Sequence, residues 1–325
     1  MARLFAATGN GLARLAEHEG RWRAHLMLEG SGAQCLALAS RSQPQGLLAG
    51  CRGGGVWRSD DHGTTWRDLG FPERDVFSLA VSPADGALYA GCEPSRLFRS
   101  RDLGEHWEAL DALLELPSRP TWSFPPRPWT SHVRWIAPSP HDPQLLLVGI
   151  ELGGLMRTAD GGLTWQDHRP GAQPDVHAIA WHPTVEGRVY EAGGGGTAWS
   201  LDGGETWRAA DDGRDRNYTW ALAVDPADAD TWFVSASRGP FDAHRADRHA
   251  QAYIYRRRAD GPWAPLDGGL PQPLDAMPYA LTFVDDRLFA GLRDGRLYAS
   301  SDGGDTWDEQ RLEGAVIPSI TALAG

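Results

Sequence analysis

The chain has 325 residues, with 43 acidic and 31 basic side chains, a formal net charge of −12, 15 Trp, 39 Gly and 3 Cys. The acidic balance excludes a nucleic-acid binder with a basic surface, and no apolar run reaches the ~20 residues of a membrane span. The first residues hold too short an apolar stretch for a secretory signal, and three cysteines do not make a disulfide framework, so we expect a cytoplasmic protein without membrane or nucleic-acid partners.

A turn motif recurs along the chain and accounts for much of the Trp and Gly. Five segments match Ser/Thr-x-Asp-x-Gly-x-x-Trp, and two degraded copies keep a turn and the final Trp. The spacing gives a repeat of about 42 residues with two insertions. These turns are expected to be structural, because a carboxylate can bond the amides of its own turn and Gly can take a positive φ. The acidic residues assigned to them are Asp60, Asp102, Asp160, Asp202 and Asp302.

Short runs rich in β-forming residues flank each motif, such as 77–81, 87–90 and 96–99 in the third repeat. Each repeat therefore predicts four antiparallel strands, and seven repeats predict an all-β, seven-bladed β-propeller forming one domain over 1–325. The expected blades are 315–325 plus 1–29, 33–69, 75–114, 131–168, 175–210, 217–267 and 277–312, with loop insertions at 115–130 and 237–251.

The two ends of the chain match different strands of the repeat. Residues 3–7 match its second strand, whereas residues 319–324 match its first strand. The C-terminal strand is therefore expected to join the N-terminal blade, which closes the ring and leaves no free sheet edge.

The motif resembles the Asp-box (BNR) repeat of the sialidase-like, sortilin and photosystem II assembly-factor propellers, and the resemblance covers essentially the whole chain. It implies a propeller whose Asp turns are structural, but a fold alone does not set a function. The chain departs from sialidases because it has seven expected blades instead of six and no Arg-Ile-Pro-type motif near its start. A typical sialidase is therefore not expected.

Two positions of the repeat vary in a way that predicts a site at the mouth of the central channel. The end of the second strand holds Arg52, Glu93, Glu151 and Arg293, with Arg238 near the equivalent place in the sixth blade. A structural position needs one residue type, and strand cores do not usually carry Arg or His. The second position, which is the second residue of the first strand, holds Gln34, Phe77, Arg134, His177, Trp220, Tyr279 and Thr321. The alternative interpretations are solvated loop tips at the first position and, at the second, a hydrogen-bond network that plugs the channel.

The two insertions are expected to lie on the same side of the ring as these positions. The first is rich in Pro and carries Trp122 and Trp129, whose flat faces suit sugar rings, and the second carries Arg238 and His244. Long loops in compact domains are more often functional than not, although blade-capping elements are the alternative.

We rank first the binding of a small polar or anionic ligand of carbohydrate type, with catalysis left open. Paired carboxylates are what glycoside cleavage needs, and arginines suit an acidic sugar. Nothing in the sequence indicates an oligomeric state. The catalytic candidates are Glu151, Glu93 and His177, with Asp175 and Glu191 as further carboxylates, and the ligand-binding candidates are Arg52, Arg134, Trp220, Arg238, Tyr279, Arg293, Trp122 and Trp129.

Two alternatives belong to other classes. A metal-dependent enzyme of lyase type would use His132, His177 and His244 near Glu151, because imidazole with carboxylate suits a divalent metal, the one cofactor considered. A non-catalytic interaction scaffold would use the same mouth without chemistry.

Overall fold

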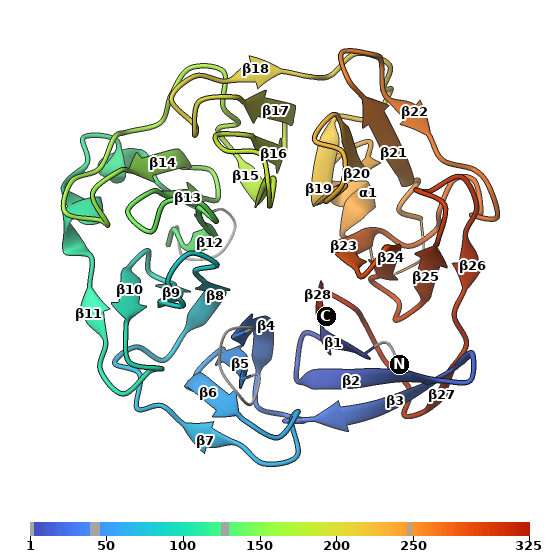
Figure 1. Ribbon diagram of the computed structural model, residues 1–325, viewed down its shortest axis with the longest axis horizontal. Helices are drawn as coiled ribbons and strands as arrows, with labels where there is room; N and C mark the ends of the chain where they lie inside the picture. The colour runs from blue at the N-terminus through green and yellow to red at the C-terminus, as the bar shows by residue number, and fades with distance from the viewer. Residues whose placement is uncertain (1–2, 40–45, 125–129, 246, 248) are drawn as a thin grey trace.

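The computed structural model of the protein describes residues 3–39, 46–124, 130–245, 247 and 249–325. Seven sheets stand around a central channel, each with its first strand innermost (Figure 1). The predicted all-β, seven-bladed propeller is therefore confirmed. None of the helices in the described part of the chain has the length and apolar character that crossing a membrane requires.

The N-terminal and C-terminal strands share blade one, which closes the ring as predicted (Figure 1). The innermost strand is antiparallel to its neighbour through Phe5 with Ala324 and Ala7 with Ala322, and the amide of Thr321 donates to the carbonyl of Ala7 at 2.8 Å. An outer strand that the repeat did not predict adds in parallel. From the channel outward, blade one contains β28 (Ala322–Ala324), β1 (Arg3–Ala7), β2 (Leu12–His18), β3 (Arg21–Met27) and β27 (Leu312–Gly314).

Blades two to four follow in chain order, and the outermost strand of blade four is reduced to a bridge between Arg157 and Gln166. Blade two contains β4 (Ala33–Ala39), β5 (Gly46–Cys51), β6 (Gly55–Ser59) and β7 (Arg67–Asp68); blade three contains β8 (Val76–Val81), β9 (Leu88–Cys92), β10 (Leu97–Ser100) and β11 (Glu108–Ala109); blade four contains β12 (Val133–Pro138), β13 (Leu146–Ile150) and β14 (Gly154–Thr158).

Blades five to seven complete the ring. Blade five contains β15 (Val176–Trp181), β16 (Val189–Gly193), β17 (Gly196–Ser200) and β18 (Arg208–Ala209); blade six contains β19 (Tyr218–Val224), β20 (Thr231–Ser237), β21 (Tyr253–Arg258) and β22 (Ala264–Pro265); blade seven contains β23 (Pro278–Val284), β24 (Arg287–Leu292), β25 (Leu297–Ser300) and β26 (Asp308–Glu309). The few helices lie between strands: η1 (Asp111–Glu115), η2 (Arg119–Thr121) and α1 (Pro240–Ala243).

The repeated turns are held by their carboxylates. In blade two, Oδ1 of Asp61 accepts the hydroxyl of Ser59 at 2.8 Å and the amide of Thr65 at 2.8 Å. These bonds, that from the Thr65 hydroxyl first, lower the pKa of Asp61 to about 2. Asp60, the residue assigned to this turn from the sequence, accepts a bond from Arg58 instead. The assignment of Asp60 was wrong, because the bonded carboxylate lies two residues after Ser59, as in the other turns. The equivalent carboxylates are Asp102, Asp160, Asp202 and Asp302.

The second strand of each blade is buried between neighbouring sheets, and a Gly in several of these strands lets the next blade approach closely. A Cβ atom added to Gly149 on β13 would lie 2.4 Å from Cγ1 of Val176 on β15. Real Cβ atoms do not approach other atoms this closely, so the contact between blades four and five requires Gly there.

We expect Gly149→Ala to destabilise the protein by about 1–3 kcal/mol through overpacking. Val176→Ala in the same chain removes the clashing methyl groups, so the double variant is expected to recover part of the loss. Urea unfolding midpoints measure both effects. Gly239→Ala is the matched control, because its added Cβ would meet no atom within 4 Å. Additive losses from Gly149→Ala and Val176→Ala would show that the two blades do not meet in this way.

Candidate functional site

The side chains of the innermost strands reach the channel through a repeated irregularity of the backbone. In blades two to five and in blade seven the pairing of the first two strands shifts register at the second residue of the first strand. In blade six the shift leaves out the third and fourth residues of β19, Trp220 and Ala221. A β-bulge of this kind leaves one residue out of the ladder and turns its side chain to a new direction. The residues at these shifts are Gln34, Phe77, Arg134, His177, Trp220 and Tyr279.

A cavity of about 230 Å³ occupies the centre of the ring, and these six residues line it together with Thr321. The structure thus brings all seven members of the second predicted position around one space. Their chemistry is uneven, because one cation and four aromatic or imidazole rings share the wall with one amide and one hydroxyl. Neighbouring blades are also joined here, since Nε2 of Gln34 donates to the carbonyl of Val76 at 2.8 Å.

His132 lies between the two carboxylates proposed as a catalytic pair. Its Nε2 is 2.7 Å from Oε2 of Glu151, and its Nδ1 is 3.4 Å from Oε2 of Glu93. Phe77 stacks on the imidazole with ring centroids 3.6 Å apart. A carboxylate only accepts hydrogen bonds, so the Nε2–H donates to Glu151.

This arrangement contradicts the assignment of Glu93 and Glu151 as an acid and base pair. The imidazole fills the space between their carboxylates where a glycosidic bond would have to lie. Burial raises the pKa of Glu151, but the bond from His132 and the charge of Arg134 outweigh it and lower the pKa to about 2. Glu151 is therefore ionised at neutral pH and is not a general acid.

Arg134 is held at the cavity wall without a hydrogen-bonding partner among the described residues. Its guanidinium carbon lies 4.6 Å from the centroid of the Trp220 ring, a cation–π contact. Its Nε is 3.6 Å from Oε2 of Glu151, too long for a hydrogen bond, and is buried without a partner in the described part of the chain. The guanidinium of Arg134 is therefore oriented by Trp220 and Glu151, while its Nε–H makes no hydrogen bond within the described part of the chain.

His244 joins two tyrosines on the side of blades six and seven. Its Nε2 is 2.8 Å from the hydroxyl of Tyr218, and its Nδ1 is 2.7 Å from the hydroxyl of Tyr279. Burial is the main cause that lowers the pKa of His244 to about 4. The ring is therefore neutral at pH 7.

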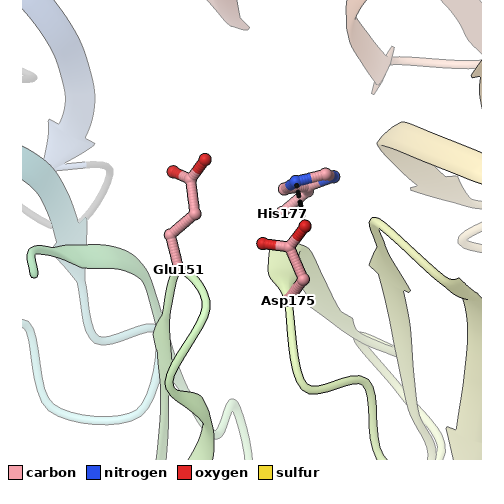
Figure 2. A group of neighbouring side chains, drawn as sticks. All are labelled: Glu151, Asp175 and His177. Atoms are coloured by element: carbon pink, nitrogen blue, oxygen red, sulfur yellow. Dashed lines mark ion pairs between the residues drawn. The ribbon is translucent and has the colours of Figure 1, made fainter. Parts of the chain in front are cut away.

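The three histidines proposed as metal ligands do not share a site. Both ring nitrogens of His132 face carboxylates, and both of His244 bond tyrosines. The structure instead brings together Glu151, Asp175 and His177, whose donor atoms all lie within 4.8 Å of one another; no other such group occurs among the residues described. Figure 2 shows Asp175 facing His177, with Glu151 beside them on the neighbouring blade.

Several candidates from the sequence lie away from the cavity. Arg52 and Arg238 are exposed and do not line it, and Arg293 donates to the carbonyl of Arg245. Trp122 is buried in the hydrophobic core beside blade four, and its indole N–H donates to the hydroxyl of Ser118. Its faces are therefore not open to a ligand, contrary to the prediction. Trp129 lies outside the described residues.

Two residues beside His177 were underrated by the sequence analysis, which named Asp175 only as a further carboxylate and did not name Tyr218. A third position in the repeat could have identified them. Asp175 and Tyr218 both lie two residues before a bulge, as does His132. A carboxylate, a phenol and an imidazole at one position of the repeat vary as much as the residues at the bulge itself. The buried carboxylate Glu191, in contrast, lies within β16 and does not line the cavity.

No protein-family model matches the chain, and no curated protein matches its sequence. Solved structures do share its fold. The GH74 xyloglucanase from Xanthomonas campestris has a TM-score of 0.68 at 18% identity, covering 98% of this chain and 53% of that one. The GH74 enzyme of Niastella koreensis has a TM-score of 0.68 at 14% identity, covering 98% and 52%. The chain therefore spans about half the length of these two structures.

A third similar structure, YCF48 bound to D1 peptide, has a TM-score of 0.61 at 17% identity and covers 91% of this chain and 85% of that one. At these identities the likenesses establish the propeller fold that the chain shares with glycosidases and with YCF48.

Proposed function

We propose that the protein binds a small carboxylate-bearing ligand of carbohydrate type in the central cavity. The observation that carries this proposal is Arg134, whose guanidinium lies over Trp220 and whose buried Nε, 3.6 Å from Glu151, has no hydrogen-bond partner among the described residues. An Arg fork matches a carboxylate in two parallel hydrogen bonds. Trp220 and Tyr279 add aromatic surface of the kind that packs on a sugar ring.

The GH74 neighbours favour a carbohydrate over other acids, since one of them is named a xyloglucanase. The proposal does not include glycoside hydrolysis, because His132 separates Glu93 from Glu151. We also propose that the repeated turns are Asp boxes of the sialidase-like and sortilin type, since their carboxylates bond the amide four residues later.

The test compares acidic sugars with their neutral counterparts by calorimetry in EDTA. The wild-type protein is expected to bind galacturonate more tightly than galactose, and Arg134→Gln is expected to weaken galacturonate binding by about 10- to 100-fold, the value of a charge-assisted bond. Arg101→Gln, which changes an exposed Arg in an outer turn, is the control and should bind as the wild type does. Equal affinity for the acid and the neutral sugar, or no effect of Arg134→Gln, would contradict the proposal.

A further inference from the structure

Glu151 and Asp175 lie beside His177, which lines the same cavity, and two adjacent blades hold the three side chains. Glu151 directly follows β13, Asp175 directly precedes β15, and His177 is the bulged residue of β15. Their donor atoms lie within 4.8 Å of one another, and both Glu151 and His177 are buried. The arrangement is therefore placed by the strand ends and not by mobile surface side chains (Figure 2).

The hydrogen bond of His177 leaves a lone pair directed at a carboxylate. Its Nδ1 lies 2.6 Å from the carbonyl of Thr219, and a carbonyl only accepts, so Nδ1 carries the proton. In the neutral ring Nε2 is then an acceptor. This Nε2 lies 3.4 Å from Oδ2 of Asp175 and is fully buried without a hydrogen-bond partner among the residues described. Two acceptors that face each other need a cation or a proton between them.

The carboxylate of Asp175 is also held by a backbone amide. Its Oδ1 accepts the amide of Leu152 at 3.3 Å, which leaves Oδ2 for the group. A Cβ atom on Gly194 would lie 2.0 Å from this Oδ2, so a side chain there would displace the carboxylate. The Gly-rich segment 193–196 thus provides the space in which Asp175 is held.

We propose that Glu151, Asp175 and His177 bind one divalent transition-metal ion beside the cavity. Two carboxylate oxygens and one imidazole nitrogen suit Mn²⁺ or Zn²⁺ more than a harder ion such as Mg²⁺. The Thr219 carbonyl holds the imidazole in the tautomer that a metal requires, a support that metal-ligating histidines generally have. A divalent ion would also offset the two negative charges that Glu151 and Asp175 place beside an anion site.

Mn²⁺ alone is the probe. Protein freed of metal with EDTA and exchanged into buffer is titrated with Mn²⁺, and electron paramagnetic resonance counts the bound ion and detects nitrogen coupling from an imidazole. We expect one Mn²⁺ per chain with nitrogen coupling, and an affinity about 100-fold lower for Asp175→Asn. Glu186→Gln, an exposed carboxylate of the same blade, is the control. No stoichiometric Mn²⁺, no nitrogen coupling, or equal affinity in Asp175→Asn would overturn the proposal.

A measurement on the wild-type protein covers the case in which Asp175→Asn fails to fold. Nitrogen NMR of His177 at pH 7.5 should show Nε2 unprotonated without metal and shifted when Zn²⁺ is added. A doubly protonated ring in both conditions would mean that a proton, and not a metal, lies between His177 and Asp175, and the proposal would be wrong. Titration with metal and no sugar tests this site alone, whereas galacturonate binding in EDTA tests the proposed function alone.

Discussion

A chain that ends at Pro318 is expected to lose cooperative folding, because β28 joins the C-terminal end of the chain to the N-terminal strand β1 and so closes the ring. Its removal deletes the pairing of Ala322–Ala324 with β1 and the bond from the Thr321 amide to Ala7. It also deletes Ile320, which is fully buried and packs over Gly291 in blade seven. Loss of one such side chain alone costs about 2–5 kcal/mol, and the exposed edge of β1 would invite association with other chains.

Urea unfolding followed by Trp fluorescence and by circular dichroism checks this expectation. The truncated chain should show no sharp transition, whereas Ile320→Ala should keep a cooperative transition at a lower midpoint. Val316→Ser, which changes a side chain that is 85% exposed just before the strand, is the control. A peptide of residues 315–325 added to the truncated chain is expected to restore the transition. Unfolding of the truncated chain at the wild-type midpoint would refute the role given to β28.

The stability of the protein is expected to fall as the pH rises from about 4.5 to about 8, and Glu191→Gln should remove most of this dependence. Burial raises the pKa of Glu191 to about 8, against which the amide of Gln173, 2.8 Å from Oε2, acts only in part. The folded state therefore binds a proton that the unfolded state has released above pH 4.5, and this contribution is lost as the pH passes 8. Each unit of pKa shift corresponds to about 1.4 kcal/mol, so Glu191→Gln should stabilise the protein by several kcal/mol at pH 9 relative to pH 4.5.

Melting temperatures between pH 4.5 and pH 9 give the comparison. Glu186→Gln again serves as the control, because an exposed carboxylate of the same blade should leave the pH profile unchanged. Parallel profiles for the wild type and Glu191→Gln would show that Glu191 ionises normally.

His244 affects stability at acid pH in the opposite direction. Because its pKa in the folded state is about 4, the unfolded state binds a proton first as the pH falls. Stability is therefore lost as the pH falls from about 6.5 to 4.

The sequence predicts the ring well because its signals are local and repeated. The spacing of Trp residues such as Trp66 and Trp107 sets the blades, and the mismatch between the two chain ends predicts the closure by β28. The parallel strand β27 follows from no motif, since only contact with β3 orders it. In blade two the motif itself places the carboxylate two residues after Ser59, so the assignment of Asp60 in place of Asp61 was an error of register between two successive aspartates.

The candidate site was predictable as a set of positions but not as a set of contacts. Register on the repeat selects the residues around the cavity, because each blade contributes a residue near the start of its innermost strand. It does not show that His132 separates Glu93 from Glu151, since these residues come from two blades and meet only in three dimensions. Trp122 was placed at the mouth because of its loop, yet hydrophobic packing draws it into the core.

The bulge found in six blades separates the residues that pair the strands from the residues that line the cavity. The residue at each bulge is outside the ladder of hydrogen bonds, so its identity is not constrained by strand pairing. Pairing by the neighbouring residues, such as Val133 and Val176, therefore does not depend on the residue at the bulge, although Gln34 and His177 also bond the carbonyls of the next blade. A few residues that are far apart in the sequence therefore line one pocket. Varying their codons together could change the ligand preference without redesigning the ring.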